Sequence, residues 1–362
     1  MLERYAEFVV NNAAQVNSIE NGLRMLTYVL PGRFADAELA SEAIYTVLSF
    51  VGVYHDGLLA RAAKAGLLAD RGGNAVEVDV TAFNRYQGHL WGRSETYRAV
   101  ALVLSALQFS EKLVEMAVAK RGGDKTRWKT VFWMEVTKAV LRLGLLQLSG
   151  RRMVTGSVIP ERLVDPAQLG SGIRGGAKDG APWRGERSGL RFKAVRDVLA
   201  QSEGAAHPGA FVSSEARHPE TVSPARSLVR RYSSLGALGE LLFILRPVLY
   251  VLGIRRLGRT DWKPWALSLL VELVSRQMVR TDLHASDRDA LERTVERDEL
   301  SRRKWLFLYY LLRSPFLDRF TESRMTRMAD WCSNKPLLNL LGALLGDYLP
   351  LWKQYYFYTS AS

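Results

Sequence analysis

The sequence predicts an all-α protein with two helical blocks joined by a disordered, Gly/Pro-rich linker. Apolar residues recur at helical spacing in both blocks, and no convincing series of strands occurs. Between the blocks, residues 151–230 hold six of the 12 prolines and only three aromatic residues, too few to bury a core of their own. We therefore expect an N-terminal helical region (1–150), a disordered basic linker (151–230) and a C-terminal helical region with an aromatic tail (231–362).

The composition limits the classes of function. Of the 362 residues, 48% are hydrophobic and 24% are charged, which excludes disorder of the whole chain. The single cysteine, Cys332, excludes an internal disulfide framework, and the five histidines lack metal-ligand spacing. The net charge is +13, but most basic residues alternate with acidic ones, as on a solvated helix face. We expect no catalytic residue, metal, cofactor, small-molecule substrate or nucleic acid.

Four helices are predicted in the first block, because each is preceded by a residue that can cap it. They run from Ser18 to Leu30, from Asp36 to about Ala69, from Glu95 to Lys120 and from Asp124 to about Leu148. The proposed caps are Ser18, Asp36, Ser94 and Asp124. Pro31-Gly32 ends the first helix and Gly122-Gly123 ends the third, since both pairs disfavour a continuing helix.

The last block predicts helices at 235–254, 265–280, 286–313, 315–331 and 336–345, followed by aromatic residues from Tyr348 to Tyr358. Ser314-Pro315 predicts a corner, with Ser314 capping the next helix and Pro315 at its first position.

For the segment 235–254, the free energies that favour and oppose insertion into a membrane nearly cancel. Its twelve Leu, Ile, Phe and Val residues favour insertion by roughly 4–7 kcal/mol, and Glu240 and Arg246 together cost roughly 5–7 kcal/mol if they lie centrally. Basic residues and two tryptophans follow it, a combination typical of a membrane interface. Residues 128–148 carry a similar pattern. Two helices that close a soluble bundle would show the same periodicity, so both interpretations stay open.

A membrane-associated helical protein is one of those interpretations, with a lipid surface as partner. Its candidate membrane-associating residues are Trp128, Trp133, Leu241, Phe243, Leu249, Arg255, Arg256, Arg259, Trp262 and Trp265.

Several motifs along the chain resemble the peroxin-16 family of peroxisomal membrane assembly factors. The most specific is Leu-Tyr-Tyr-Leu-Leu-Arg-Ser-Pro-Phe at 308–316, followed by Asp-Arg-Phe at 318–320. Supporting motifs are Leu-Pro-Gly-Arg-Phe-Ala-Asp at 30–36, Arg-Pro at 246–247, Trp-Lys-Pro-Trp at 262–265 and Asp-Tyr-Leu-Pro at 347–350 with Trp352. They occur in both helical blocks, in the order expected of the family.

The resemblance implies a non-enzymatic role in building the peroxisomal membrane. The implied partners are peroxin-3 and, through it, the chaperone peroxin-19 with its membrane-protein cargo. The implied location is the peroxisomal membrane, reached directly or by way of the endoplasmic reticulum. The motifs supply the candidates for partner contact: Arg33, Phe34, Asp36, Lys263, Pro264, Arg313, Ser314, Pro315, Asp318, Arg319, Phe320, Tyr348, Pro350 and Trp352. Two alternatives remain: a membrane-associated enzyme of unrecognised type, and a peripheral peroxisomal regulator of organelle division.

Overall fold

The structure is a computed structural model, and it describes residues 2–30, 36–70, 80–173, 183–184, 191–192, 225–284, 294–335 and 338–351. Its α-helices are α1 (Leu2–Asn11), α2 (Ala13–Val29), α3 (Ala37–Lys64), α4 (Ala82–Arg93), α5 (Glu95–Leu148), α9 (Ser234–Leu257), α10 (Trp262–His284), α11 (Thr294–Leu306), α12 (Glu322–Ser333) and α13 (Asn339–Leu351). The predicted all-α class is confirmed. The described residues also form two short antiparallel strand pairs, β1 (Leu68–Asp70) with β2 (Leu169–Ile173) and β3 (Trp183–Arg184) with β4 (Arg191–Phe192).

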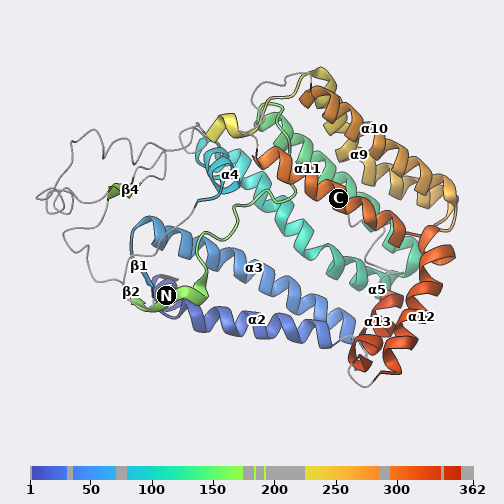
Figure 1. Ribbon diagram of the computed structural model, residues 1–362, viewed down its shortest axis with the longest axis horizontal. Helices are drawn as coiled ribbons and strands as arrows, with labels where there is room; N and C mark the ends of the chain where they lie inside the picture. Colours follow the sequence, from blue (N-terminus) through green and yellow to red (C-terminus); the bar gives the residue numbers. More distant parts are fainter. Residues whose placement is uncertain are drawn as a thin grey trace, which may run out of the picture.

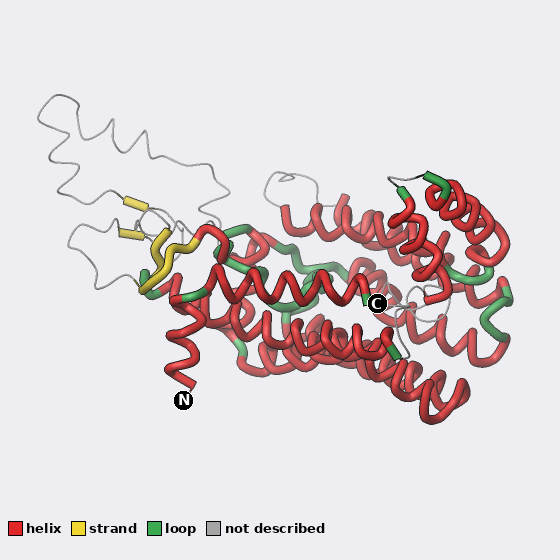
Figure 2. Tube along the Cα trace, turned by 90° about the horizontal axis from the view of Figure 1, so that it is seen from below, coloured by secondary structure: helices red, strands yellow, loops and turns green. Residues whose placement is uncertain are grey.

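The helices form three layers (Figure 1). Helices α2 and α3 lie side by side in the first layer, and α9 and α10 form an antiparallel hairpin in the third. Helix α5 lies between them and contacts both α3 and α9. Seen after a quarter turn, the β1–β2 pair lies at the end of the bundle that carries the N-terminus (Figure 2). The largest apolar core joins α4, α5 and α9.

Helix α5 consists of two antiparallel helices that share one label. Gly123 has a non-helical backbone (φ 70°, ψ −177°), a conformation that favours glycine. Across this break the Lys138 ammonium lies 2.9 Å from the Glu111 carboxylate, although the two residues are 27 positions apart. A continuous helix would separate them by about 40 Å. The predicted helix ends at Gly122-Gly123 and Leu148 are therefore confirmed.

The predicted helix starts agree only in part. The Ser94 hydroxyl accepts a bond from the Tyr97 N–H at 3.2 Å and caps α5, as predicted. The Ser18 cap is wrong, because α2 begins at Ala13 and the Ser18 hydroxyl donates to the Ala14 carbonyl inside the helix. Asp36 precedes α3 in a left-handed conformation and its side chain makes no capping bond. Helices α1 and α4 were not predicted.

Residues 151–173 lie packed against the helices, so the boundary predicted at residue 151 is not the end of the packed structure. Their apolar side chains are buried against α4 and against the ends of α1 and α3. The Arg162 guanidinium donates to the Asp56 carboxylate at 2.6 Å and to the Asn17 side chain at 2.8 Å. The prediction of a disordered linker therefore fails for this segment, because apolar residues such as Val154 and Val158 pack with helices that are distant in the sequence. Residues 193–224 of the predicted linker lie outside the described residues.

The α9–α10 hairpin is held by close contact at small residues. A Cβ atom on Gly239 would lie 3.0 Å from the Met278 Cβ and from the Ser275 carbonyl oxygen, tighter than ordinary packing allows. Because the two helices lie so close here, the Ser275 hydroxyl can donate to the Gly239 carbonyl at 2.8 Å. Gly258, at φ 93°, ends α9 and allows the turn into α10.

The Ser314-Pro315 corner exists, but its details differ from the prediction. Helix α11 gives way to a 3₁₀-helix at Phe307–Leu312, and a π-helical turn at Leu317–Thr321 separates Pro315 from α12. Within the described residues the Ser314 hydroxyl makes no capping bond, and the Arg313 carbonyl accepts from the Leu317 N–H instead. Ser314 contributes through its backbone, since its carbonyl accepts from the Tyr250 hydroxyl at 3.4 Å.

Candidate functional site

The start of α10 and the segment after α11 meet in an aromatic junction, which we define as Trp262, Trp265, Tyr310, Phe316 and Phe320. The Trp265 indole stacks on Phe316, with centroids 6.0 Å apart and an interplanar angle of 11°. Its N–H donates to the Tyr310 carbonyl at 3.1 Å. Trp262 meets Phe320 edge to face at 6.4 Å. Contacts of this kind add specific geometry to apolar burial, so two motifs far apart in the sequence form one unit.

Tyr310 connects this junction to the interior. Its ring is buried, and its hydroxyl lies 2.8 Å from the Ser268 hydroxyl on α10. The Arg313 guanidinium lies over the Tyr310 ring at 4.6 Å and over the Tyr250 ring at 5.1 Å. Arg313 and Ser314 are both buried. Among the motif candidates, Arg313 and Ser314 therefore support the junction rather than offer a surface to a partner.

The rim of the junction is open and basic. Trp262 and Phe320 are exposed, and so are Lys263 and Arg319. Arg255 and Arg256, at the end of α9, are exposed as well. Arg259 is half-buried; burial, together with the nearby Arg127, lowers the pKa of its guanidinium. Pro264 and Pro315 are buried, and Asp318 is half-buried.

Helix α13 and the neighbouring ends of α2 and α3 carry the other described motif candidates, at the same end of the bundle as the α9–α10 turn (Figure 1). The Tyr348 hydroxyl on α13 donates to the Tyr28 carbonyl at the end of α2, at 3.0 Å. Asp36 pairs with Lys120 at 2.5 Å, and both side chains are more than half exposed. Pro350 is exposed on α13. Arg33, Phe34 and Trp352 lie outside the described residues.

The candidate membrane-associating residues differ in how far they reach the surface. Trp133, Arg255, Arg256 and Trp262 are exposed, and Trp128, Leu241, Leu249, Arg259 and Trp265 are half-buried. Phe243 is buried, and two guanidinium groups lie close to its ring, with Arg303 at 4.0 Å and Arg246 at 4.7 Å from the ring centroid. In this fold Phe243 has almost no surface to offer a membrane, because only 4% of the residue is exposed.

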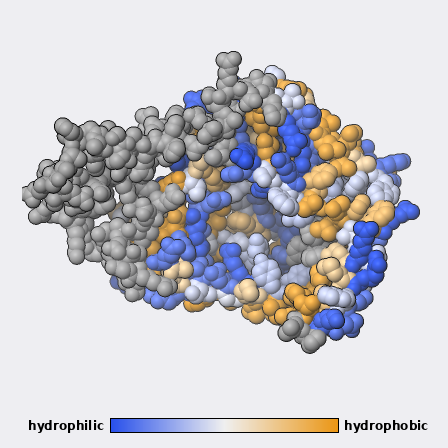
Figure 3. Space-filling model, in the orientation of Figure 1, coloured by the Kyte–Doolittle hydropathy of each residue, from blue (hydrophilic) through white to orange (hydrophobic). Residues whose placement is uncertain are grey.

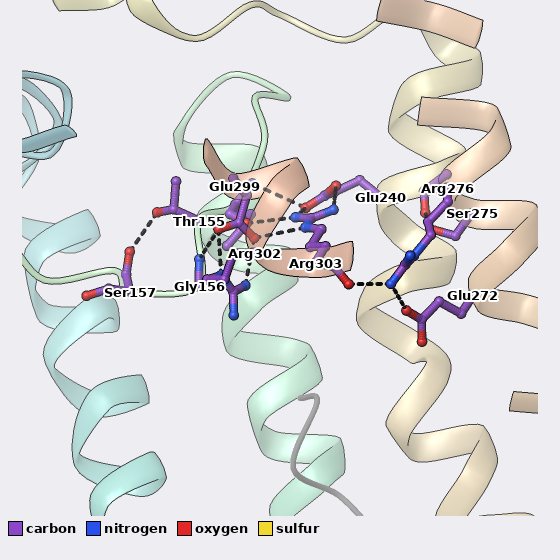
Figure 4. Close-up of polar contacts among 12 residues, drawn as sticks. Thr155, Gly156, Ser157, Glu240, Glu272, Ser275, Arg276, Glu299, Arg302 and Arg303 are labelled. Carbon is purple, nitrogen blue, oxygen red and sulfur yellow. Dashed lines mark hydrogen bonds and ion pairs between the residues drawn. The ribbon is translucent and has the colours of Figure 1, made fainter. Parts of the chain in front are cut away.

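A buried ion network between α9, α10 and α11 was not predicted (Figure 4). Arg303 on α11 donates to both oxygens of Glu240 on α9, at 2.7 and 2.8 Å, and to Glu299 at 2.9 Å. It also donates to the Val154 carbonyl at 3.0 Å. On α10, Glu272 accepts from Arg246 and Arg276. The network joins α9, α10, α11 and residues 154–156, and each carboxylate in it has a guanidinium partner.

Glu240 and Arg246 were counted as costs of membrane insertion, but in this fold they hold helices together. By length and composition, α3 and α9 could each cross a membrane, and 39% and 50% of their most apolar windows are buried inside the protein. Glu240 and Arg246, the two charged residues inside the apolar part of α9, are both buried in the protein. No three His, Cys, Asp or Glu side chains in the described part of the chain are placed to hold a metal ion.

The network makes stability sensitive to acid. Burial would raise the pKa of Glu299, but Arg302 and Arg303 outweigh it and lower that pKa to about 2. The charged carboxylate therefore stabilises the fold above its ordinary pKa of 4.5, and this contribution is lost as the pH falls from 4.5 toward 2. We expect the free energy of unfolding of wild type to exceed that of Glu299→Gln near neutral pH. That difference should shrink by about 2 kcal/mol between pH 6 and pH 3, which covers part of this window.

The measurement is chemical denaturation of both proteins between pH 6 and pH 3. The comparison with the variant is essential, because burial raises the pKa values of Glu115 and Glu135 and opposes the effect in the wild-type profile. A difference that stays constant with pH would contradict the assigned role of Glu299.

The chain is similar to proteins of one known family. The family model described as "Peroxisomal membrane protein (Pex16)" matches residues 3–354. "Peroxisome biogenesis protein 16" of Arabidopsis thaliana is 25% identical over 391 aligned residues that cover the whole of both chains. "Peroxisome biogenesis factor 16" of Dictyostelium discoideum is 36% identical over 127 residues, 34% of this chain and 31% of that protein.

A more distant relative, "Peroxisomal membrane protein PEX16" of Schizosaccharomyces pombe, is 19% identical over 335 residues, covering 89% of this chain and 88% of that protein. No solved structure matches the chain. Because the family model spans both helical blocks and the segment between them, the chain belongs to the Pex16 family of peroxisomal membrane proteins.

Proposed function

We propose that the protein is a non-enzymatic factor of peroxisome membrane biogenesis that recruits peroxin-3, and through it peroxin-19 with its cargo, to the peroxisomal membrane. The observation that carries the proposal is that the start of α10, the segment between α11 and α12, and α13 lie at one end of the bundle (Figure 1). The residues that are exposed there, Trp262, Lys263, Arg319 and Phe320, come from motifs that lie about 55 positions apart in the sequence. Folding therefore brings the motifs to a shared surface.

The surface has the properties of a protein-binding site. Aromatic and arginine side chains dominate the binding energy at interfaces, and here both types are exposed on a rigid support. Trp262 and Phe320 rest on Trp265 and Phe316, which are fixed by stacking and by the bond to Tyr310. Little side-chain freedom would be lost on binding, so the cost of ordering the site is low.

The test is a single substitution on the rim. We expect Phe320→Ala to weaken recruitment of peroxin-3 to peroxisomal membranes at least tenfold, because truncation of a central interface aromatic typically costs 2 kcal/mol or more. The stability of the fold should change little, since the Phe320 ring is exposed. The measurement is the amount of peroxin-3 retained on isolated membranes that carry either protein.

A matched control is Phe8→Ala. Phe8 is an exposed phenylalanine on α1, 55% against 44% for Phe320, at the opposite end of the bundle. Equal recruitment by wild type, Phe8→Ala and Phe320→Ala would contradict a recruiting role for the junction.

A further inference from the structure

Helix α10 carries an exposed apolar ridge, which we define as Ala266, Leu267, Leu270, Leu273 and Val274. The four larger side chains are 46%, 58%, 47% and 42% exposed. Their spacing of three and four residues places them on one face of the helix. The space-filling view shows hydrophobic residues gathered over the α9–α10 hairpin (Figure 3). Contiguous apolar surface of this kind marks a site of interaction.

The ridge is not the face by which α10 packs against the rest of the protein. The opposite face of α10 is buried and fully used, with Ser268, Glu272, Ser275 and Val279 turned inward. Ser268 and Ser275 bond to Tyr310 and to the Gly239 carbonyl, and Glu272 binds two arginines. The outward leucines therefore lie on a helix whose position is already fixed.

Basic residues bound the ridge at both ends. Lys263 precedes it and Arg280 follows it, and both are exposed. Trp262 is exposed beside Lys263, and Arg255 and Arg256 are exposed at the end of the neighbouring helix. The exposed apolar face from 266 to 274 is about 13 Å long, far short of the roughly 30 Å of a bilayer core. A spanning orientation would place Lys263 or Arg280 in hydrocarbon, whereas an orientation parallel to the surface keeps both at headgroup level.

We propose that the α10 ridge binds the surface of a bilayer that contains anionic lipids, with α10 parallel to the membrane plane and its leucines at the headgroup–acyl boundary. Charge complementarity favours lipid over a protein helix as the occupant, because the basic residues lie at both ends of an otherwise uncharged ridge. The inference deepens the proposed function, since it orients the aromatic junction, at one end of the ridge, along the membrane surface.

Depth measurements test the orientation directly. The full chain carries Cys332→Ala and one environment-sensitive fluorophore on a cysteine at position 266, 270 or 274. The probe membranes are vesicles of phosphatidylcholine and phosphatidylserine with brominated acyl chains. We expect all three positions to be quenched from the same shallow depth. A spanning helix would instead separate 266 and 274 by about 12 Å in depth. A graded depth, or no quenching at any of the three, would overturn the inference.

Substitutions test the two contributions separately. We expect Leu267→Asn with Leu270→Asn to lower vesicle partitioning at least tenfold, because two partly buried leucines are lost from the apolar phase. The matched control is Leu340→Asn with Leu341→Asn, a pair of equally exposed leucines on α13. Lys263→Gln and Arg280→Gln should each lower partitioning about fivefold on anionic vesicles and leave neutral vesicles unaffected. Lys64→Gln, an exposed lysine on α3, is the control for charge.

The outcomes separate this inference from the proposed function, because the vesicles contain no protein. Ridge variants that bind vesicles as wild type does, but fail to recruit peroxin-3, would overturn the lipid assignment in favour of a protein partner. Loss of vesicle binding in the ridge variants, with binding intact in Phe320→Ala, would support it. Unimpaired recruitment by Phe320→Ala would count against the proposed function alone.

Discussion

Arg303→Ala is expected to lower the free energy of unfolding by about 3–5 kcal/mol, because it leaves the buried carboxylate of Glu240 without its ion-pair partner. Arg303 is buried and binds Glu240, Glu299 and the Val154 carbonyl at once. Its removal therefore releases α11 from α9 and from residues 154–156 together. Chemical denaturation of the purified full chain measures the loss.

The neighbouring Arg302 provides the matched control. It binds the same Glu299 carboxylate at 2.7 Å, but its side chain is 42% exposed. We expect Arg302→Ala to cost at most about 1 kcal/mol, as partly solvated ion pairs usually do. The double variant Glu240→Leu with Arg303→Met should be more stable than Arg303→Ala, because it removes both buried charges. Equal losses in the two single arginine variants would contradict the network.

Trp265→Ala is expected to cost about 3 kcal/mol, because it removes the indole that joins α10 to the segment after α11. Trp265→Phe should cost about 1 kcal/mol, since it keeps the stacking on Phe316 and loses only the bond to the Tyr310 carbonyl. The graded series separates packing from hydrogen bonding, and thermal or chemical denaturation measures it.

Trp305→Ala is the control for this series. The Trp305 ring is 70% exposed, so its loss should change stability by no more than about 0.5 kcal/mol. A Trp265→Ala variant that is as stable as Trp305→Ala would show that the aromatic junction does not hold the two segments together.

Helix ends that depend on nearby residues were predictable from the sequence. The Ser94 cap, the break at Gly122-Gly123 and the end of α5 at Leu148 each follow from a local signal that no distant contact overrides. Ser18 and Ser314 carry the same kind of signal but do not cap a helix. Ser18 lies inside α2, and Ser314 lies between a 3₁₀-helix and a π-helical turn. A capping residue shows where a helix can begin, and packing decides whether it does.

The partners of charged residues were not predictable. Glu240 and Arg246 in an apolar segment indicate either a poor membrane span or a buried ion pair, and the sequence around them does not distinguish the two. The residue that decides is Arg303, which lies 63 positions after Glu240. Likewise, the Pro-rich composition predicted disorder for residues 151–158, although they pack in the fold. Their hydrogen-bond partners lie in α4, α9 and α11.

The residues of the aromatic junction could be identified from sequence motifs, but their contacts in the fold could not be predicted. The motif residues were named individually, and only the fold shows that Trp265 and Phe316 stack while Arg313 lies buried behind them. The α10 ridge did have a local signal, since Leu267, Leu270 and Val274 follow helical spacing in a helix that was predicted. Its exposure could not be known before α9 was seen to cover the opposite face.

Photocrosslinking on native membranes tests most directly the claim that the aromatic junction forms the surface that recruits peroxin-3. The full chain carries a photoreactive phenylalanine analogue at position 320, or at position 8 as control, on isolated peroxisomal membranes that contain peroxin-3. We predict an adduct with peroxin-3 from position 320 and none from position 8. An adduct from position 8 alone, with recruitment intact in both proteins, would contradict the account.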